Sequence, residues 1–461
     1  MNKVLLIGLL ILLIAISGCQ KGELELVAKE KAAEATAEVS GIEVGTGWSS
    51  NENPEQAVIE AVDMALEGKI DKTPDFAIVF ASSGSDMDAI LSKARELLGD
   101  KTKIYGGTSD SRGVMTNKGF VKVSEKGYEY GMMGGKRGLA LITISSEEIV
   151  FGVGSADFSA YSSVQEASKT AVLNAIKSAG KSKDEVPDLI LITPTKPDED
   201  SAIDGIEQVV GENTLIMGGT AGGPVFGIIG EDEIYESGIS LAVIYTDLAI
   251  GWTFEGGFDV EDPNSGVVTK IEGRNILEID SKPALDVYNE WLEGKVEKLY
   301  EEHKDSRVVK NLLTLHPLYR KYKTEDGQEY FLFSHPWPTD PTQKEKGVST
   351  STNIKEGDRV YLSHGTWETL ANRIGNLPKN AKLKAEIGIN EKPIFGIGYI
   401  CAGIMGTIPE TEREKLPILI NYANNNAPFI ATFTWGEQGH FPGICNVHGN
   451  LLTSFIIIGK K

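Results

Sequence analysis

The chain has 461 residues and a formal net charge of −21; 41% of the residues are hydrophobic and 24% are charged. This length predicts two or three domains, and the composition is typical of a folded globular protein. A surface this acidic repels phosphate backbones and no basic cluster offsets it, so we expect no nucleic-acid partner.

The chain opens with a short hydrophobic segment between a lysine and a group of small residues. The apolar run covers residues 4–16 after Lys3 and is too short to span a bilayer as a helix, so we predict an export signal over residues 1–18. Ile-Ser-Gly-Cys at 16–19 resembles the lipobox of prokaryotic lipoproteins. The resemblance implies lipidation of Cys19 and a membrane-anchored lipoprotein at the extracytoplasmic face.

The segment after the lipobox cysteine predicts a tether. Residues 19–41 are rich in Ala, Glu and Lys with little apolar face, which is typical of a partly helical or a disordered spacer. After lipidation only Cys401 and Cys445 remain. Both a disulfide and two buried free thiols fit their apolar surroundings.

Strands and helices then alternate. Asn53 and Pro54 are typical of a helix N-cap and first residue, and Gly68 ends that helix. The strand over 103–108 ends in a predicted turn at Gly106, Gly107 and Thr108. The remaining predictions here are a buried strand and small-residue loop over 74–84, a helix over 87–99, and a hairpin of strands over 137–144 and 147–154.

Residues 150–252 repeat this series in the same order. Pro-Asp-Phe-Ala-Ile-Val-Phe at 74–80 returns as Pro-Asp-Leu-Ile-Leu-Ile-Thr at 187–193, and the Gly-Gly-Thr turn returns 112 residues later at Gly218, Gly219 and Thr220. We therefore predict an α/β fold with layered mixed sheets from a tandemly duplicated helix–strand–helix–strand–hairpin unit over 42–257. An α+β C-terminal domain is expected over 258–461.

The C-terminal part has a different character. A hairpin is predicted around Gly273, followed by a helix opened by Ser281 and Pro283. Another helix is predicted after Thr366, and the last 70 residues or so read as apolar strands.

These segments together resemble the FIST family. The N-terminal resemblance lies in Val-Gly-Thr-Gly-Trp-Ser-Ser at 44–50 and in the segments 74–84, 104–110 and 138–144. The C-terminal resemblance lies in 267–292, 316–322, 354–370, 398–403, 435–439 and 447–457. The resemblance covers about residues 42–458. It implies a FIST N-type domain over 42–257 and a FIST C-type domain over 258–461, with a sensory role toward a small ligand, amino acids among the proposed ones.

The chain departs from the family at one position. Many members carry an Arg shortly after the cysteine of the C-terminal strand, where this chain has Ile404 and Met405. An Arg would favour a carboxylate through paired hydrogen bonds, so a carboxylate ligand is not expected to be held from this position.

Ligands of layered α/β sheets bind beyond the carboxyl ends of strands, where loops and turns gather. Glu437 is a further candidate, because a carboxylate beside Trp435 could receive a ligand ammonium, although a water-exposed turn residue fits the same pattern. The candidate ligand-binding residues are Ser82, Ser83, Gly106, Gly107, Thr108, Thr193, Gly218, Gly219, Thr220, Cys401, Trp435, Glu437, His448 and Asn450.

We expect no cofactor, no metal and no catalytic residue. The six histidines, at 303, 316, 335, 364, 440 and 448, lack tight ligand spacing. The sequence predicts a lipid-anchored sensor that binds a small molecule and signals through a membrane signalling or transport protein. Two alternatives stay open: a hydrolase that uses Cys401 and a histidine, and an adaptor that binds only proteins.

Overall fold

The computed structural model describes residues 41–67, 73–110, 113–122, 137–196, 198–231, 233–261, 263–302, 306–338 and 346–461. The predicted export signal, Cys19 and almost all of the predicted tether lie outside these residues. Within the described ranges, no helix is long and apolar enough to cross a bilayer.

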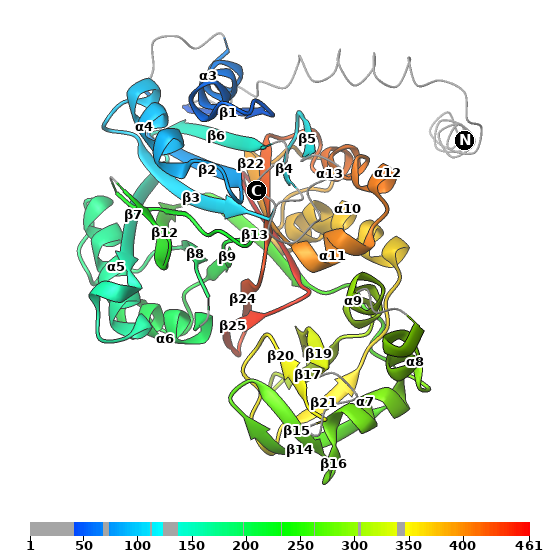
Figure 1. The fold of residues 1–461 in the computed structure, drawn as a ribbon. Helices are drawn as coiled ribbons and strands as arrows, with labels where there is room; N and C mark the ends of the chain where they lie inside the picture. Colours follow the sequence, from blue (N-terminus) through cyan, green and yellow to red (C-terminus); the bar gives the residue numbers. More distant parts are fainter. Residues whose placement is uncertain are drawn as a thin grey trace, which may run out of the picture. The chain divides into compact units, whose positions relative to one another are not determined.

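The first repeat forms a mixed sheet with two helices packed on it (Figure 1). Its strands lie in the order β1-β6-β2-β3, and only β2 and β3 are parallel. As predicted, Asn53 caps the first helix by accepting a hydrogen bond from the Gln56 amide. The elements are β1 (Ile42–Ser49), α3 (Pro54–Ala65), β2 (Phe76–Ser82), α4 (Met87–Leu98), β3 (Lys103–Ser109) and β6 (Leu139–Ser146).

The second repeat has the same order and pairing, which confirms the predicted duplication. Its sheet runs β7-β12-β8-β9, again with one parallel pair, β8 and β9. The predicted hairpin was wrong: β6 and β7 are consecutive but lie in different sheets, because both edges of β6 already pair with β1 and β2. The elements are β7 (Ile149–Asp157), α5 (Val164–Ser178), β8 (Leu189–Pro194), α6 (Glu199–Val210), β9 (Ile216–Gly219) and β12 (Gly238–Thr246).

A third copy of the unit, which the sequence analysis missed, completes the fold. Its sheet runs β13-β26-β22-β23, and β22 and β23 are the parallel pair. The predicted domain boundary after residue 257 separates β13 from its sheet partner β26. The elements are β13 (Ala249–Glu255), α10 (Trp367–Lys384), β22 (Phe395–Cys401), α11 (Ala402–Thr407), α12 (Glu410–Arg413), α13 (Leu416–Ala423), β23 (Phe429–Thr434) and β26 (Thr453–Gly459).

The first strand of each copy packs closely against its helix through a glycine. A Cβ on Gly47 would lie 1.8 Å from the carbonyl oxygen of Ala61, so the helix backbone can approach only because the side chain is missing. In the second copy, a Cβ on Gly154 would lie 2.1 Å from the carbonyl oxygen of Ala171, and in the third copy a Cβ on Gly251 would lie 2.0 Å from that of Ala381. The shared contact supports the equivalence of the three copies.

The third copy is interrupted between its first strand and its first helix. We call residues 256–366 the insertion; its main sheet follows the order β18-β17-β21-β14-β15-β20-β19. The predicted hairpin around Gly273 is confirmed as β14 and β15. The elements are β14 (Ser265–Glu272), β15 (Asn275–Ile279), β16 (Lys282–Pro283), α7 (Ala284–Trp291), α8 (Lys295–Glu302), α9 (Ser306–Leu315), β17 (Leu318–Lys323), β18 (Glu329–Ser334), β19 (Pro336–Pro338), β20 (Val348–Thr350) and β21 (Arg359–Leu362).

Each copy donates a hairpin to the sheet of another copy. The first copy places β4 (Gly113–Thr116) and β5 (Gly119–Lys122) on β23, the second places β10 (Ile228–Ile229) and β11 (Ile234–Tyr235) on β3, and the third places β24 (Glu437–Phe441) and β25 (Cys445–Gly449) on β9. The ends of β3, β9 and β23 therefore meet. Three backbone hydrogen bonds join them: Gly222 N–H to Thr108 O, Asp110 N–H to Phe433 O, and Trp435 N–H to Thr220 O.

Candidate functional site

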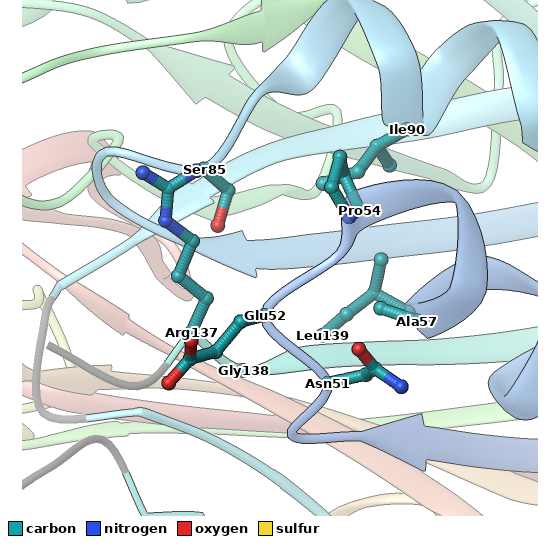
Figure 2. A pocket seen from close by; sticks show the side chains of 9 residues that line it. All are labelled: Asn51, Glu52, Pro54, Ala57, Ser85, Ile90, Arg137, Gly138 and Leu139. Atoms are coloured by element: carbon teal, nitrogen blue, oxygen red, sulfur yellow. The ribbon is translucent and has the colours of Figure 1, made fainter.

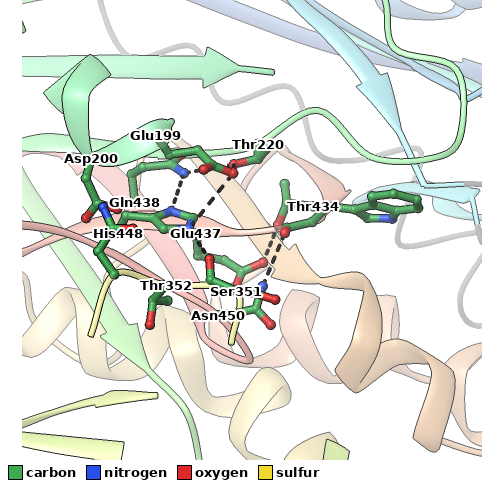
Figure 3. A network of polar contacts seen from close by, with 12 residues as sticks. Glu199, Asp200, Thr220, Ser351, Thr352, Thr434, Glu437, Gln438, His448 and Asn450 are labelled. Carbon is green, nitrogen blue, oxygen red and sulfur yellow. Dashed lines mark hydrogen bonds and ion pairs between the residues drawn. The ribbon is translucent and has the colours of Figure 1, made fainter. Parts of the chain in front are cut away.

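A buried polar cluster forms where the second repeat, the third repeat and the insertion meet (Figure 3). Six of the predicted residues belong to it: Thr220, Cys401, Trp435, Glu437, His448 and Asn450. The fold adds residues from α6, from the β8–α6 loop and from the insertion. We call it the junction cluster, made of Lys196, Glu199, Asp200, Thr220, Arg274, Ser351, Cys401, Thr434, Trp435, Glu437, Gln438, His448 and Asn450.

An ion pair ties the insertion to α6. Arg274, in the turn between β14 and β15, lies 3.3 Å from Glu199 Oε2 and 3.4 Å from Asp200 Oδ2. Glu199 is only 1% exposed. Burial alone would raise the pKa of Glu199, but the His448 ring, the Arg274 guanidinium and Lys196 outweigh it and hold the pKa below its usual range. Glu199 therefore stays ionised in the protein interior.

A hydrogen-bonded row of side chains crosses from β9 to β25. The Gln438 amide nitrogen donates to Thr220 Oγ1 and to His448 Nδ1, each at 3.0 Å. The other ring nitrogen of His448 lies 3.3 Å from the Ser351 carbonyl of the insertion and 3.9 Å from Glu199 Oε1. Gln438 Oε1 is buried without a hydrogen-bond partner in the described part of the chain. The row thus keeps one unused acceptor.

Glu437 is a buried strand residue, not a water-exposed turn residue. Its oxygens accept hydrogen bonds from Thr434 Oγ1 at 2.7 Å and from the Leu452 amide at 3.1 Å. Burial raises the pKa of Glu437 to about 8, although both hydrogen bonds act against the shift. The carboxyl is therefore largely protonated at neutral pH.

Cys401 ends β22 beside Glu437. Burial first, and the neighbouring Glu437 second, raise the pKa of the Cys401 thiol far above its ordinary value. Cys401 and Cys445 are both free thiols, so the disulfide alternative is not realised. A thiol held neutral in this way is a packing group and a weak hydrogen-bonding group, not a ready nucleophile.

Lys196 enters the cluster from the loop between β8 and α6, and no sequence motif had singled it out. Its ammonium lies 5.0 Å from the centre of the Trp435 ring. Trp435 is held in place because its indole N–H donates to Asp110 Oδ2 at 2.7 Å and its ring meets the ring of Phe226 edge-on at 6.0 Å. Burial lowers the pKa of Lys196. Lys196 stands out only in the folded chain, because the charged groups around it come from distant parts of the sequence.

The predicted serines and Thr193 lie outside this cluster. Ser82 Oγ accepts a hydrogen bond from the Gly138 amide, and its repeat counterpart, Thr195 Oγ1, accepts one from the Gly238 amide. Ser83 Oγ donates to the Val225 carbonyl at 2.9 Å. Thr193 Oγ1 is hydrogen-bonded to the buried Tyr105 hydroxyl, which is also hydrogen-bonded to the Tyr399 hydroxyl. Thr193 therefore helps to join the cores of the three copies.

The predicted Gly-Gly-Thr turns are strands: Gly106, Gly107 and Thr108 lie in β3, and Gly218 and Gly219 end β9 just before Thr220. Their glycines make room for protein backbone: a Cβ on Gly106 would lie 1.9 Å from the Val79 carbonyl oxygen, and one on Gly218 would lie 2.1 Å from that of Ile192. Gly107 and Gly219 are buried in the same strands, and Thr108 Oγ1 accepts a hydrogen bond from the Gly227 amide.

We also considered a small surface pocket and the remaining histidines as sites. Figure 2 shows a small pocket at the carboxyl end of β2, lined by Asn51, Glu52, Pro54, Ala57, Ser85, Ile90, Arg137, Gly138 and Leu139. In the described ranges, no group of three or more His, Cys, Asp or Glu side chains could hold a metal ion. Burial, with Lys196 and Lys310, lowers the pKa of His335 to about 3, so this ring is neutral. His303 lies outside the described residues.

Comparison with known families identifies the chain. The FIST N domain matches residues 75–282 and the FIST C domain matches residues 284–440. The chain is a FIST-family protein. FIST domains are generally sensory, ligand-binding domains of signal transduction. The predicted resemblance to this family is thereby confirmed.

Solved structures show only distant likeness to this FIST protein. A cyanuric acid hydrolase from A. caulinodans is 8% identical, with 91% of this chain and 100% of the other covered and a TM-score of 0.37. PurLQS from Thermotoga maritima is 9% identical, with 94% and 77% covered and a TM-score of 0.21. At these values the likeness supports no inference about activity. No curated protein matches the sequence.

Proposed function

We propose that this FIST protein is a lipid-anchored, extracytoplasmic sensor that binds a small polar metabolite, with amino acids as candidates, at the junction cluster. The observation that carries the proposal is the collection of ionisable groups in the cluster: Glu199, Glu437 and His448 are buried, and Lys196 and Arg274 are half-buried. Perturbed titratable groups gathered between parts of a fold are typical of binding and catalytic sites.

The contacts across the cluster suggest how binding would be signalled. The insertion meets α6 through Arg274 and meets β25 through the contact of His448 with the Ser351 carbonyl. A ligand that joins these groups would favour one arrangement of the insertion over others. We propose that a membrane signalling or transport protein reads this change, because the FIST domains supply the sensing part.

The anchoring part of the proposal rests on the lipobox-like residues 16–19. Mass spectrometry of the N-terminal peptide of membrane-extracted protein tests it. We expect an acylated Cys19, and a Cys19→Ala variant released from the membrane fraction. An unprocessed N-terminus would contradict this part of the proposal and leave ligand binding untouched.

A thermal-shift screen against amino acids, carboxylates and other small polar metabolites tests the binding part. A ligand at a hundredfold excess over its Kd should stabilise the folded chain by about 2.7 kcal/mol. Glu437→Gln keeps the shape of the side chain and should weaken the response, whereas Glu185→Gln, an exposed change in the second repeat, should not. A screen in which no compound raises the melting temperature would contradict the proposal and favour an adaptor that binds only proteins.

The hydrolase alternative makes an opposite prediction at Cys401. Because burial and Glu437 raise the pKa of its thiol, iodoacetamide should modify Cys401 far more slowly at neutral pH than it does in the unfolded chain. Fast modification of the folded protein would revive the nucleophile hypothesis.

A further inference from the structure

One cation of the junction cluster makes no ion pair within the part of the chain that the structure describes. Lys196 makes no hydrogen bond and no ion pair with any residue of the described ranges; its ammonium lies over the Trp435 ring, and the charge of Glu199 acts on it without an ion pair. The side chain is half-buried and follows β8 by two residues. A cation taken out of water without a partner is unfavourable, so such groups mark places where an anion completes the site.

The nearby acidic groups are engaged elsewhere. Glu199 accepts hydrogen bonds from Arg274 and from Thr220 Oγ1. Glu437 accepts from Thr434 and from the Leu452 amide, and its raised pKa leaves it largely neutral at pH 7. The Cys401 thiol and the His335 ring are neutral as well. Of these groups only Glu199 carries a negative charge, and its oxygens already accept hydrogen bonds from Arg274 and Thr220.

The other two copies lack this cation. Ser82, Thr195 and Cys401 occupy one position of the repeat, because their amides donate to the carbonyls of Gly138, Gly238 and Leu452 respectively. The next residue is Ser83 in the first copy, Lys196 in the second and Ala402 in the third. In the first copy, both the amide and the carbonyl of Val225 bond Ser83 Oγ, so protein satisfies that position.

We propose that Lys196 binds the carboxylate of a small ligand beside the indole face of Trp435, so that the ligand of this site is a carboxylate anion. The inference rests on the proposed ligand-binding function and names its chemical class. Gln438 Oε1, the unused acceptor of the cluster, suits a donor group on the same ligand.

Matched probes and variants test the inference. Amino acids and simple monocarboxylates are titrated by calorimetry next to their amides, which keep the shape and lose the charge. We expect the acids to bind and their amides to bind about 10- to 100-fold more weakly. Lys196→Met should cause a loss of similar size, and Lys196→Arg should retain part of the affinity.

A second lysine provides the control. Lys384 Nζ lies 5.3 Å from the centre of the Trp252 ring, and burial lowers its pKa too. Lys384→Met makes the same charge change beside a tryptophan outside the cluster and should leave binding unchanged. In the wild type, NMR of ¹³C-dimethylated lysines should show the Lys196 pKa rising when an acid binds, with Lys196→Arg assigning the signal.

The outcomes separate the two proposals. Equal binding of acids and amides, or unchanged affinity in Lys196→Met, would overturn the role of Lys196 while ligand binding stands. Binding of no probe at all would overturn the ligand-binding proposal itself, and this inference with it.

Discussion

The first and third copies of the repeat end the same strand with different chemistry. In the first copy, Ser82 Oγ accepts a hydrogen bond from the Gly138 amide, so both hydrogen-bonding partners belong to the same repeat. In the third copy, Cys401 stands at the position of Ser82, and the amide of Leu452, the counterpart of Gly138, donates to the carboxyl of Glu437 from β24. The first copy therefore has a neutral hydroxyl at this strand end, where the third copy uses the buried carboxyl of Glu437 from the β24–β25 hairpin.

The difference teaches where function resides in a repeated fold. The shared features of the copies, such as the glycine–alanine contacts of first strands and helices, serve packing. The ionisable groups of the junction cluster gather where copies two and three meet the insertion. Departures from the repeat therefore point to the site better than the repeated motifs do.

The largest expected effect breaks the packing that the copies share. Gly106 has a φ of 148°, and a Cβ there would lie 1.9 Å from the Val79 carbonyl oxygen. Gly106→Ala should lower the free energy of unfolding by about 4 kcal/mol, or prevent folding, because strain and overpacking add. Ala431, its counterpart in the third copy, already carries a Cβ, so Ala431→Gly should cost about 1 kcal/mol. Equal losses in urea denaturation would contradict the equivalence of these strands.

The next effect isolates the buried acid of the third copy. Since the folded pKa of Glu437 is about 8 and its ordinary value is 4.5, the folded state binds this proton more tightly than the unfolded state. The stability from this proton is present below pH 4.5 and is lost as the pH rises through about 8. Glu437→Gln should remove this fall and be more stable than the wild type at pH 9 by about 3 kcal/mol. Parallel stability curves of the two proteins between pH 5 and pH 9 would refute the shift.

A smaller effect tests the link between the insertion and the second repeat. Arg274→Met leaves Glu199 buried without its arginine partner and should cost about 2 kcal/mol in urea denaturation near neutral pH. Arg359→Met provides the control, because Arg359 is exposed and its side chain makes a single 3.4 Å hydrogen bond, to Ser265, within the described ranges; it should cost less than about 0.5 kcal/mol. If both variants lose the same stability, the ion pair does not support the fold.

The smallest effect tests the neutral contact of the first copy. Ser82→Ala removes one buried hydrogen bond and leaves the Gly138 amide unsatisfied, which should cost about 1 kcal/mol. Thr195→Val makes the matching change in the second copy and should cost a similar amount. A large difference between these two variants would show that the copies are not equivalent at this position.

Much of the fold was predictable because its signals are local. The N-cap at Asn53, the buried strand of β2 and the hairpin at Gly273 depend on neighbouring residues, and all three are confirmed. The third copy was missed because the insertion places 111 residues, 256–366, between β13 and α10, which hides the spacing of the repeat. The expected hairpin of β6 and β7 failed because strand partners are chosen in space, and sequence adjacency does not decide them.

The sequence by itself determined the family and the duplication, since these depend on residue order and on motifs that the chain carries locally, and six of its candidate residues lie in the junction cluster. Only the tertiary structure decided that Lys196, Glu199 and Arg274 meet those six. Their charges acquire meaning through burial and through partners that lie far away in the chain. The same holds for Glu437, whose carboxyl is neutral at pH 7 because folding removes it from water.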